Sequence, residues 1–358
     1  MSATPFNRAE LLDSDVGVRA SRTMGAARAL RLGLVLLCAA AAALVAALAV
    51  GSSHIALADV VGYLVRPDDS AASEVIHQLR LPRALAAFAS GGLLAYAGAL
   101  MQVLLRNPLA DPYVLGLSGG SAVGALGAML LGMGAFLIEL GAFAGALATV
   151  ALVFAFAGRE LVRMPGSGGA DATPRLLLTG VVLASGWSAI ITVLLIIAPE
   201  GKLRGMLFWL MGDLSGSDSY AVALVALPAA LLLTYPAARD LNVMLRGPDV
   251  AHALGVRVGR LRRLALLGAS LATAVAVTTA GAVGFIGLIV PHALRLAIGN
   301  DQRVLLPACA LAGGTLLLVA DTVARTAFAP LQVPVGAVTA LLGVPTFMFL
   351  LMRRGRGA

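Results

Sequence analysis

The chain has 358 residues, of which 59% are apolar and only 12% are charged, whereas soluble domains carry about 25% charged residues. This composition excludes a single soluble core and makes lipid the solvent for most of the chain. The formal net charge is +8, but the basic residues are scattered between apolar runs and form no stripe with interleaved aromatic residues, which argues against nucleic acid as a partner. Cys38 and Cys309 each lie alone in an apolar run, so neither a disulfide framework nor a metal centre is expected.

Ten apolar runs follow one another along the chain, and each spans roughly the 20 residues that cross a bilayer as a helix. The first run is too long for the apolar core of a signal peptide, which has about 7 to 15 residues. We therefore expect a cytoplasmic N-terminal segment at residues 1–29 and an all-α, ten-helix transmembrane domain at residues 30–354. The predicted spans are 30–50, 84–105, 114–131, 137–157, 176–198, 220–237, 264–279, 281–297, 305–324 and 335–352.

The arginine distribution predicts how these spans are oriented. An even number of spans places both termini on one side of the membrane, and cytoplasmic loops carry an excess of Lys and Arg. With the N-terminus inside, twenty of the 26 basic residues lie in inner segments. The sequence thus predicts a multi-pass protein of the bacterial inner membrane with both termini in the cytoplasm. The six outer basic residues are Arg66, Arg80, Arg83, Lys202, Arg204 and Arg325.

Small residues are frequent in the spans, as in Gly91, Gly92 and Gly98 of the second and Gly120 and Gly124 of the third. Helices associate in membranes where small side chains let their backbones approach. We expect these glycines to serve helix packing.

The longest cytoplasmic segment between spans, residues 239–263, contains a helix-compatible piece from Asp249 to Leu254. Gly255 follows it, and after residues 256–258 comes a second glycine, Gly259. A short helix, a glycine break and a second short helix would form a compact knob suited to a soluble partner. The alternative is an ordinary basic loop of the kind that topology requires.

Three outer arginines stand out on a face with few charges. Arg80 and Arg83 flank Pro82 at the start of the second span, and Arg325 lies at the outer end of the ninth. Guanidinium groups pair bidentately with carboxylates, so these three could receive acidic groups of a partner. Alternatively they reach to lipid headgroups, or Asp321 pairs with Arg325 along its helix.

The chain lacks a phosphate-binding loop, and its single lysine is Lys202. We therefore expect no nucleotide site and no enzymatic activity in this chain. Mid-span carboxylates are nearly missing, which disfavours an ion-coupled secondary transporter. The four histidines are dispersed over both sides, which disfavours a membrane enzyme. His292, next to Pro291 in the eighth span, is expected to donate a hydrogen bond to a freed carbonyl.

These features together resemble the ten-span permeases of type II ABC importers, a FecCD/BtuC-like family that imports iron-siderophores, heme and cobalamin. The resemblance covers about residues 30–354 and is carried by specific segments. These are LRLPR at 79–83, GALMQ at 98–102, RNPLADP at 106–112, GAVGFIGLIVPH at 281–292, ADTVAR at 320–325 and PVGAVTALLGVP at 334–345.

The resemblance implies a homodimer with two ATP-binding subunits beneath it and a periplasmic substrate-binding protein above it. ATP and Mg would be bound by the partner ATPase, with no cofactor in this chain. The motifs assign Arg80, Arg83 and Arg325 to docking of the binding protein. They assign the coupling of the ATPase to the segment around Gly247, Asp249, Ala251, Leu254, Gly255, Arg257 and Gly259.

The resemblance also implies a translocation path lined by the fifth and tenth spans, with a cytoplasmic gate at Thr173 and Pro174. Pro174 departs from the small hydroxyl residue common in relatives, and Gln332 stands where relatives commonly have Glu. The later motifs are most similar to heme and cobalamin permeases. We take heme as the expected substrate, with an iron-siderophore or cobalamin as the alternative.

Overall fold

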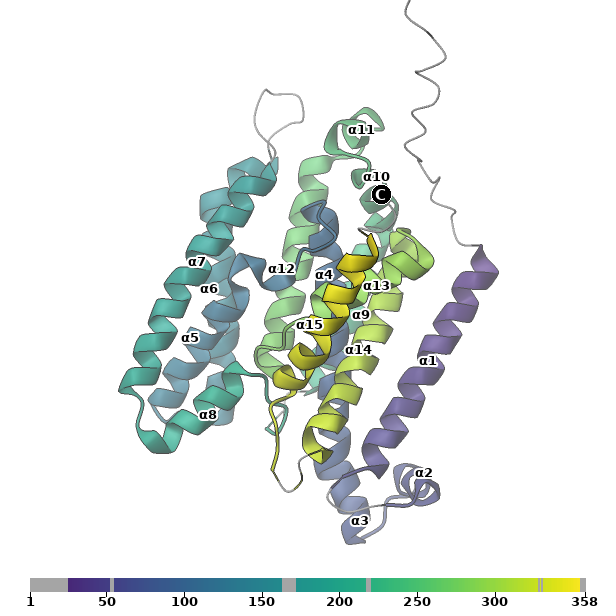
Figure 1. The fold of residues 1–358 in the computed structure, drawn as a ribbon, viewed down its shortest axis with the longest axis vertical. Coiled ribbons are helices and arrows are strands. Elements are labelled where there is room, and N and C mark those ends of the chain that lie inside the picture. Colours follow the sequence, from purple (N-terminus) through teal and green to yellow (C-terminus); the bar gives the residue numbers. More distant parts are fainter. Residues whose placement is uncertain are drawn as a thin grey trace, which may run out of the picture.

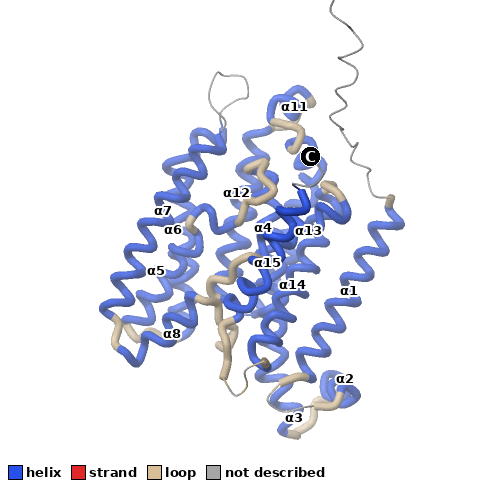
Figure 2. Tube along the Cα trace, in the orientation of Figure 1, coloured by secondary structure: helices blue, strands red, loops and turns tan. Residues whose placement is uncertain are grey.

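The computed structural model describes residues 25–51, 55–162, 172–216, 220–327, 329 and 331–354, and within these residues the chain is helical without a strand (Figures 1 and 2). The first 24 residues of the predicted N-terminal segment lie outside the described residues. The first helix begins at Ala26, four residues before the predicted span. The expected all-α membrane architecture is confirmed.

Each predicted span overlaps one apolar helix of the described residues. Seven of the helices are long and apolar enough to cross a membrane, and three apolar helices are shorter. The ten helices are α1 (Ala26–Ala49), α4 (Leu81–Leu104), α5 (Leu117–Leu130), α6 (Ala135–Val162), α7 (Ala172–Ile197), α9 (Tyr220–Thr234), α12 (Val258–Ala280), α13 (Ile286–Ile298), α14 (Gln302–Thr326) and α15 (Val335–Arg354).

The helix α4 forms the centre of the bundle and packs against α9, α12, α13 and α14. Glycines allow this packing, as predicted. A Cβ on Gly98 would lie 1.8 Å from the carbonyl oxygen of Gly287 on α13, and a Cβ on Gly124 of α5 would lie 1.9 Å from that of Gly141 on α6. Only a residue without a side chain permits such approaches, which supply the van der Waals contact that holds helices together in lipid.

The N-terminal part of α4 differs from the prediction. The helix does not start at residue 84 but continues from α3 (Ala71–Glu74) through a π-helical turn (Val75–Arg80). Pro82 lacks an amide hydrogen and its ring would clash with the carbonyl one α-turn earlier. The wider π-turn, in which Leu81 N–H donates to the Ile76 carbonyl, avoids this clash. The chain therefore keeps helical geometry through Pro82.

The predicted eighth span at 281–297 is only partly helical. Its helix α13 has 13 residues and is about 20 Å long, short of the roughly 30 Å hydrocarbon core. Residues 281–285 are irregular, and Phe285 has a left-handed backbone with φ of 70°. Irregular backbone is tolerated at membrane depth where protein surrounds it, and Gly281 and Val283 are buried here.

Short helices cap the two ends of the bundle (Figure 1). At one end lie α2 (Leu57–Val65), α3 and α8 (Glu200–Leu210). At the other end lie α10 (Ala238–Met244) and α11 (Pro248–Ala253), together with the start of α1 and the end of α15. We call these the α8 end and the α11 end. Two single 3-10 turns, Pro112–Leu115 and Tyr235–Ala237, complete the helical elements.

Candidate functional site

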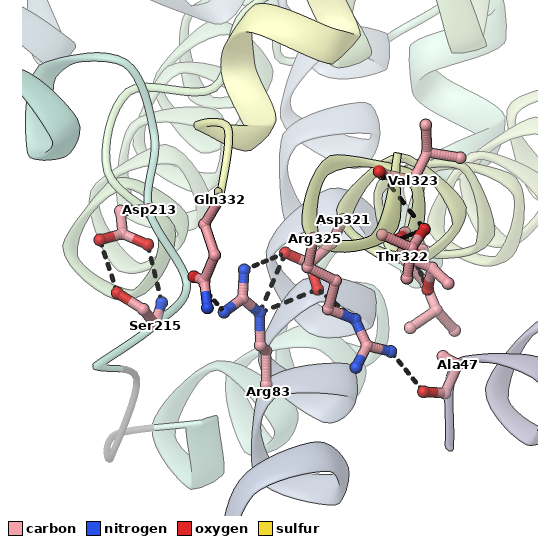
Figure 3. A network of polar contacts seen from close by, with 11 residues as sticks. Ala47, Arg83, Asp213, Ser215, Asp321, Thr322, Val323, Arg325 and Gln332 are labelled. Atoms are coloured by element: carbon pink, nitrogen blue, oxygen red, sulfur yellow. Dashed lines mark hydrogen bonds and ion pairs between the residues drawn. The ribbon is translucent and has the colours of Figure 1, made fainter. Parts of the chain in front are cut away.

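A buried ion-pair network occupies the α8 end of the bundle (Figure 3). Arg83 Nε donates to both carboxylate oxygens of Asp321 at 3.1 and 3.0 Å, and its Nη2 donates to Oδ1 at 2.8 Å. The Asp321 side chain is 2% exposed and that of Arg83 is 15% exposed. Three hydrogen bonds to one buried carboxylate make this the strongest polar contact between α4 and α14 among the described residues.

The other two predicted docking arginines join the same region. Arg325 Nε lies 3.8 Å from Asp321 Oδ2, and its Nη2 donates to the Ala47 carbonyl at the end of α1. Arg80 Nη1 donates to the Leu48 carbonyl at 2.6 Å and to the next carbonyl at 3.1 Å. Both arginines therefore satisfy carbonyls that the last turn of α1 leaves unpaired.

These contacts bear unequally on the availability of the three arginines to a partner. Arg80 is 5% exposed and is largely committed to holding α1 against α4. Arg83 and Arg325 are partly buried but still line a pocket of about 320 Å³. Three guanidinium groups line this pocket, and only Arg83 and Arg325 contact the carboxylate of Asp321, so the pocket keeps an excess of positive charge. It suits an acidic side chain of a partner.

Sequence reasoning found all three arginines but missed the central position of Asp321. The spacing of Asp321 and Arg325 suggested a contact within one helix, and that ion pair exists. The shorter contact joins Asp321 to Arg83, 238 residues away, and no local pattern signals it. Gln332 also meets this network, because its Oε1 accepts a 3.5 Å hydrogen bond from Arg83 Nη1.

The α11 end carries the predicted knob. The helix α11 begins after Gly247, which has φ of 114°, and ends before Gly255, which has φ of 82°. The Gly255 N–H donates to the His252 carbonyl and the Val256 N–H to the Ala251 carbonyl, both at 2.9 Å. Only glycine adopts these backbone angles without strain. The two glycines therefore fix a compact helix–turn unit.

The surface of this knob combines apolar and charged groups. Leu254 is 65% exposed and Val250 is 44% exposed, whereas Ala251 is fully buried and anchors the unit. Asp249 and Arg257 are exposed beside them. Exposed large apolar side chains among charges, outside the apolar spans, are typical of a protein docking surface.

One part of the knob prediction is wrong. The residues after the break at Gly255 form no second short helix, because the long helix α12 starts at Val258 and includes Gly259 in its first turn. The second short helix is instead α10, on the N-terminal side of the knob. Gly259 is helical because α12 already starts at Val258, six residues before the predicted span.

The predicted gate residues lie in the first turn of α7. Pro174 is exposed, and a proline is compatible with this position because the first helical N–H groups have no partner within the helix. Thr173 is helical, and its side chain lies outside the described residues. The predicted gate stays a prediction.

Two helices of the bundle have one face left open. The helix α7 contacts α5 and α6, whereas α15 contacts α13 and α14. The open face of α7 carries large apolar side chains, such as Val182 and Val193, with Ser185, Ser188 and Thr192 among them. That of α15 carries Leu341 and Thr346.

The loop after α4 holds a carboxyl group with an altered acidity. Asp111 Oδ1 accepts a 2.8 Å hydrogen bond from the Tyr113 amide and thereby begins the following 3-10 turn. Burial nevertheless raises the pKa of Asp111 from 3.8 to about 6. Among the described residues, no group of three or more His, Cys, Asp or Glu side chains is arranged to hold a metal ion.

A bundle of ten apolar helices with a cationic pocket at one end and a helical knob at the other agrees with the predicted permease of an ABC importer. The chain belongs to the FecCD transport family, whose sequence model matches residues 37–353. It is thus a transport subunit, and ATP hydrolysis in such importers belongs to a separate subunit. The predicted family membership is confirmed.

Curated relatives and solved structures agree with this assignment. The chain is 44% identical to the cobalamin import system permease protein BtuC of Halobacterium salinarum, over 79% of this chain and 74% of the relative. It is 42% identical to the vitamin B12 import system permease protein BtuC of Escherichia coli O6:H1, over 78% and 84%. An inward-facing metal-chelate type ABC transporter superposes with a TM-score of 0.77 at 29% identity, over 90% of this chain and 99% of that one.

Proposed function

We propose that this permease imports a cobalamin-type corrinoid. The identity of 44% and 42% to permeases named for cobalamin and vitamin B12 carries this proposal. This similarity favours cobalamin, the alternative substrate, over heme, for which neither relative gives support. Iron-siderophore import is likewise without support from these two relatives.

The outer pocket is the proposed docking site for a periplasmic binding protein. Arg83 and Arg325 line it with an excess of positive charge, and Asp321 holds both side chains in place. An acidic side chain of the binding protein would meet donors that are already in place. Binding would therefore cost the arginines little side-chain entropy. Arg80 contributes mainly by fixing the end of α1, where it donates to the Leu48 carbonyl. Arg325 donates to the Ala47 carbonyl at the same end of α1.

The helix α11 is the proposed contact with the ATPase subunits. Its exposed Leu254 and Val250 offer an apolar anchor, and the charged neighbours Asp249 and Arg257 offer a polar rim. The helix α11 packs against both α10 and α12, so a push on the knob would move these two helices with it. The orientation follows, with the α11 end and both termini in the cytoplasm.

The open faces of α7 and α15 are the proposed translocation path, completed by a second copy of the chain. Mid-span hydroxyls of α7 and apolar side chains of α15 match a ligand that is large, partly apolar and rich in amide groups. In this arrangement Thr173 and Pro174 lie at the cytoplasmic mouth. We propose alternating access, in which ATP binding to the partner subunits moves the two copies against each other.

Transport in proteoliposomes tests the substrate assignment. The permease is reconstituted with its ATPase and binding protein, and uptake of labelled cyanocobalamin is compared with uptake of heme and a ferric siderophore. We expect ATP-dependent uptake of cyanocobalamin that excess unlabelled corrinoid inhibits and excess heme does not. Uptake of heme without uptake of corrinoid contradicts the proposal.

Charge removal in the outer pocket tests the docking assignment. Arg83→Gln with Arg325→Gln is expected to abolish the stimulation of ATP hydrolysis by loaded binding protein, while the basal ATPase rate of the assembled transporter persists. The outer, exposed Arg66 provides the control, and Arg66→Gln is expected to leave the stimulation unchanged. Full stimulation of the double variant refutes the docking site.

A further inference from the structure

A lateral groove lies between α1 and the beginning of α14, at the α11 end of the bundle. Its volume is about 370 Å³. Its walls are apolar, with Leu32 and Gly33 on α1 and with Pro307 and Leu311 on α14. The end of the groove nearest to the membrane surface is polar and is formed by Tyr235, Asp301 and Arg303.

The groove exists because α1 is packed against the bundle over its second half only. The buried residues of α1 are Ala40 and the three residues from Ala47 to Ala49. In its first half, Leu30 is 76% exposed and Leu34 is 60% exposed. A Cβ on Gly33 would meet no atom within 4 Å, so free space reaches the backbone of α1.

The polar end of the groove presents a fixed guanidinium group. Arg303 pairs with Asp301 through Nε at 3.0 Å and Nη2 at 2.6 Å. Asp301 is itself held by Asn242 Nδ2 at 2.9 Å, so the pair has little freedom. The pair uses one edge of the guanidinium, and the Arg303 side chain remains 39% exposed. The Nη1 edge is available to a further acceptor.

The charge of this rim favours an anion. Arg28 and Arg31 are exposed in the first two turns of α1, next to the stretch that lines the groove. Together with Arg303 they outnumber the single carboxylate of Asp301. Tyr235, 52% exposed at the same end, has the aromatic ring with a polar tip that is typical of the membrane–water interface.

We propose that this groove binds one anionic membrane phospholipid, with the phosphate at Arg303 and an acyl chain along Leu32, Gly33, Pro307 and Leu311. Guanidinium groups recognise phosphate through paired hydrogen bonds, and basic pockets between spans on the cytoplasmic side bind anionic headgroups. The apolar walls extend over about two helical turns, roughly 10 Å, and select a lipid over a free phosphate. The lipid would fill the gap that α1 leaves, whichever compound the permease imports.

Native mass spectrometry of the purified full-length permease tests this proposal. The protein is titrated with phosphatidylglycerol and with phosphatidylethanolamine of the same acyl chains. Both lipids offer a phosphate to Arg303, but only phosphatidylethanolamine adds an ammonium group, which the arginines of the rim repel. We therefore expect one phosphatidylglycerol to be retained with about tenfold preference. Arg303→Gln should remove the preference. Gly33→Phe should remove binding of the lipid by filling the groove.

The control variant is Arg246→Gln, which removes an exposed arginine at the same end of the bundle that does not line the groove. It is expected to retain the lipid preference. Equal retention of both lipids by the unmodified protein overturns the proposal, and so does equal loss in Arg246→Gln and Arg303→Gln. Unchanged lipid binding by Gly33→Phe overturns the placement of the acyl chain in this groove. This result stands on its own if Arg303→Gln misfolds.

Discussion

Removal of the charge on Asp321 is expected to destabilise the permease strongly. Asp321→Asn keeps the size of the side chain but leaves Arg83 and Arg325 without the carboxylate that they share. These two side chains are 15% and 12% exposed. Breaking a buried ion pair by removing one partner costs about 3 to 5 kcal/mol. Because the arginines also line an open pocket, we expect the lower value, about 3 kcal/mol.

Thermal unfolding in detergent measures this effect. For a chain of 358 residues, a loss of about 3 kcal/mol corresponds to a fall in melting temperature of roughly 4 °C. The control is Asp69→Asn, which removes an exposed carboxylate at the same end of the bundle, and it is expected to change the stability by less than about 0.5 kcal/mol.

A double variant separates charge from packing. Arg83→Gln combined with Asp321→Asn removes one charge of each sign, so its loss should be smaller than the sum of the two single losses by at least about 1 kcal/mol. Additive losses, or a melting temperature of Asp321→Asn equal to that of Asp69→Asn, refute the reasoning that this carboxylate holds the arginines.

Three further outcomes are expected. Gly98→Ala should lower the free energy of unfolding by at least about 3 kcal/mol, because its Cβ would lie 1.8 Å from a backbone oxygen. Gly127→Ala meets open space and should leave the yield of folded protein in size-exclusion chromatography unchanged. Leu254→Asp should abolish co-purification of the ATPase subunit, whereas Leu79→Asp, equally exposed at the opposite end, should not. Burial raises the pKa of Asp111 to about 6, so folding favours the protonated form of this side chain. The stability that Asp111 contributes is therefore present below about pH 4 and is lost as the pH rises through 6. Asp111→Asn should flatten melting temperatures measured across pH 4 to 7, and an unchanged slope would contradict this assignment.

The membrane fold could be predicted because hydropathy and arginine bias act locally. Each apolar run forms a helix irrespective of its neighbours, since lipid leaves the backbone no other partner. The boundaries were less predictable where tertiary contacts decide them. Pro82 is a local cause of the π-turn before it, but the irregular backbone at 281–285 depends on what packs around it, and no sequence period signals it.

The residues that form the site could be predicted from the sequence, but the contacts that they make could not. Arg80, Arg83 and Arg325 stood out as charges on a face with few others, yet their burial arises from the ends of α1 and α14, which are distant in sequence. Asp321 became the common partner of Arg83 and Arg325 only through folding. The glycines around α11 marked the knob correctly, because a positive φ is a local property. Gly259, which is helical, shows that a glycine alone does not mark a break.

ATP-driven corrinoid uptake in proteoliposomes tests the central claim most directly. Vesicles containing the permease and its ATPase, supplied with loaded binding protein outside and ATP inside, are expected to accumulate labelled cyanocobalamin. The same vesicles without ATP, or with an imposed proton or sodium gradient only, are expected to accumulate none. Accumulation driven by an ion gradient in the absence of ATP would contradict the account.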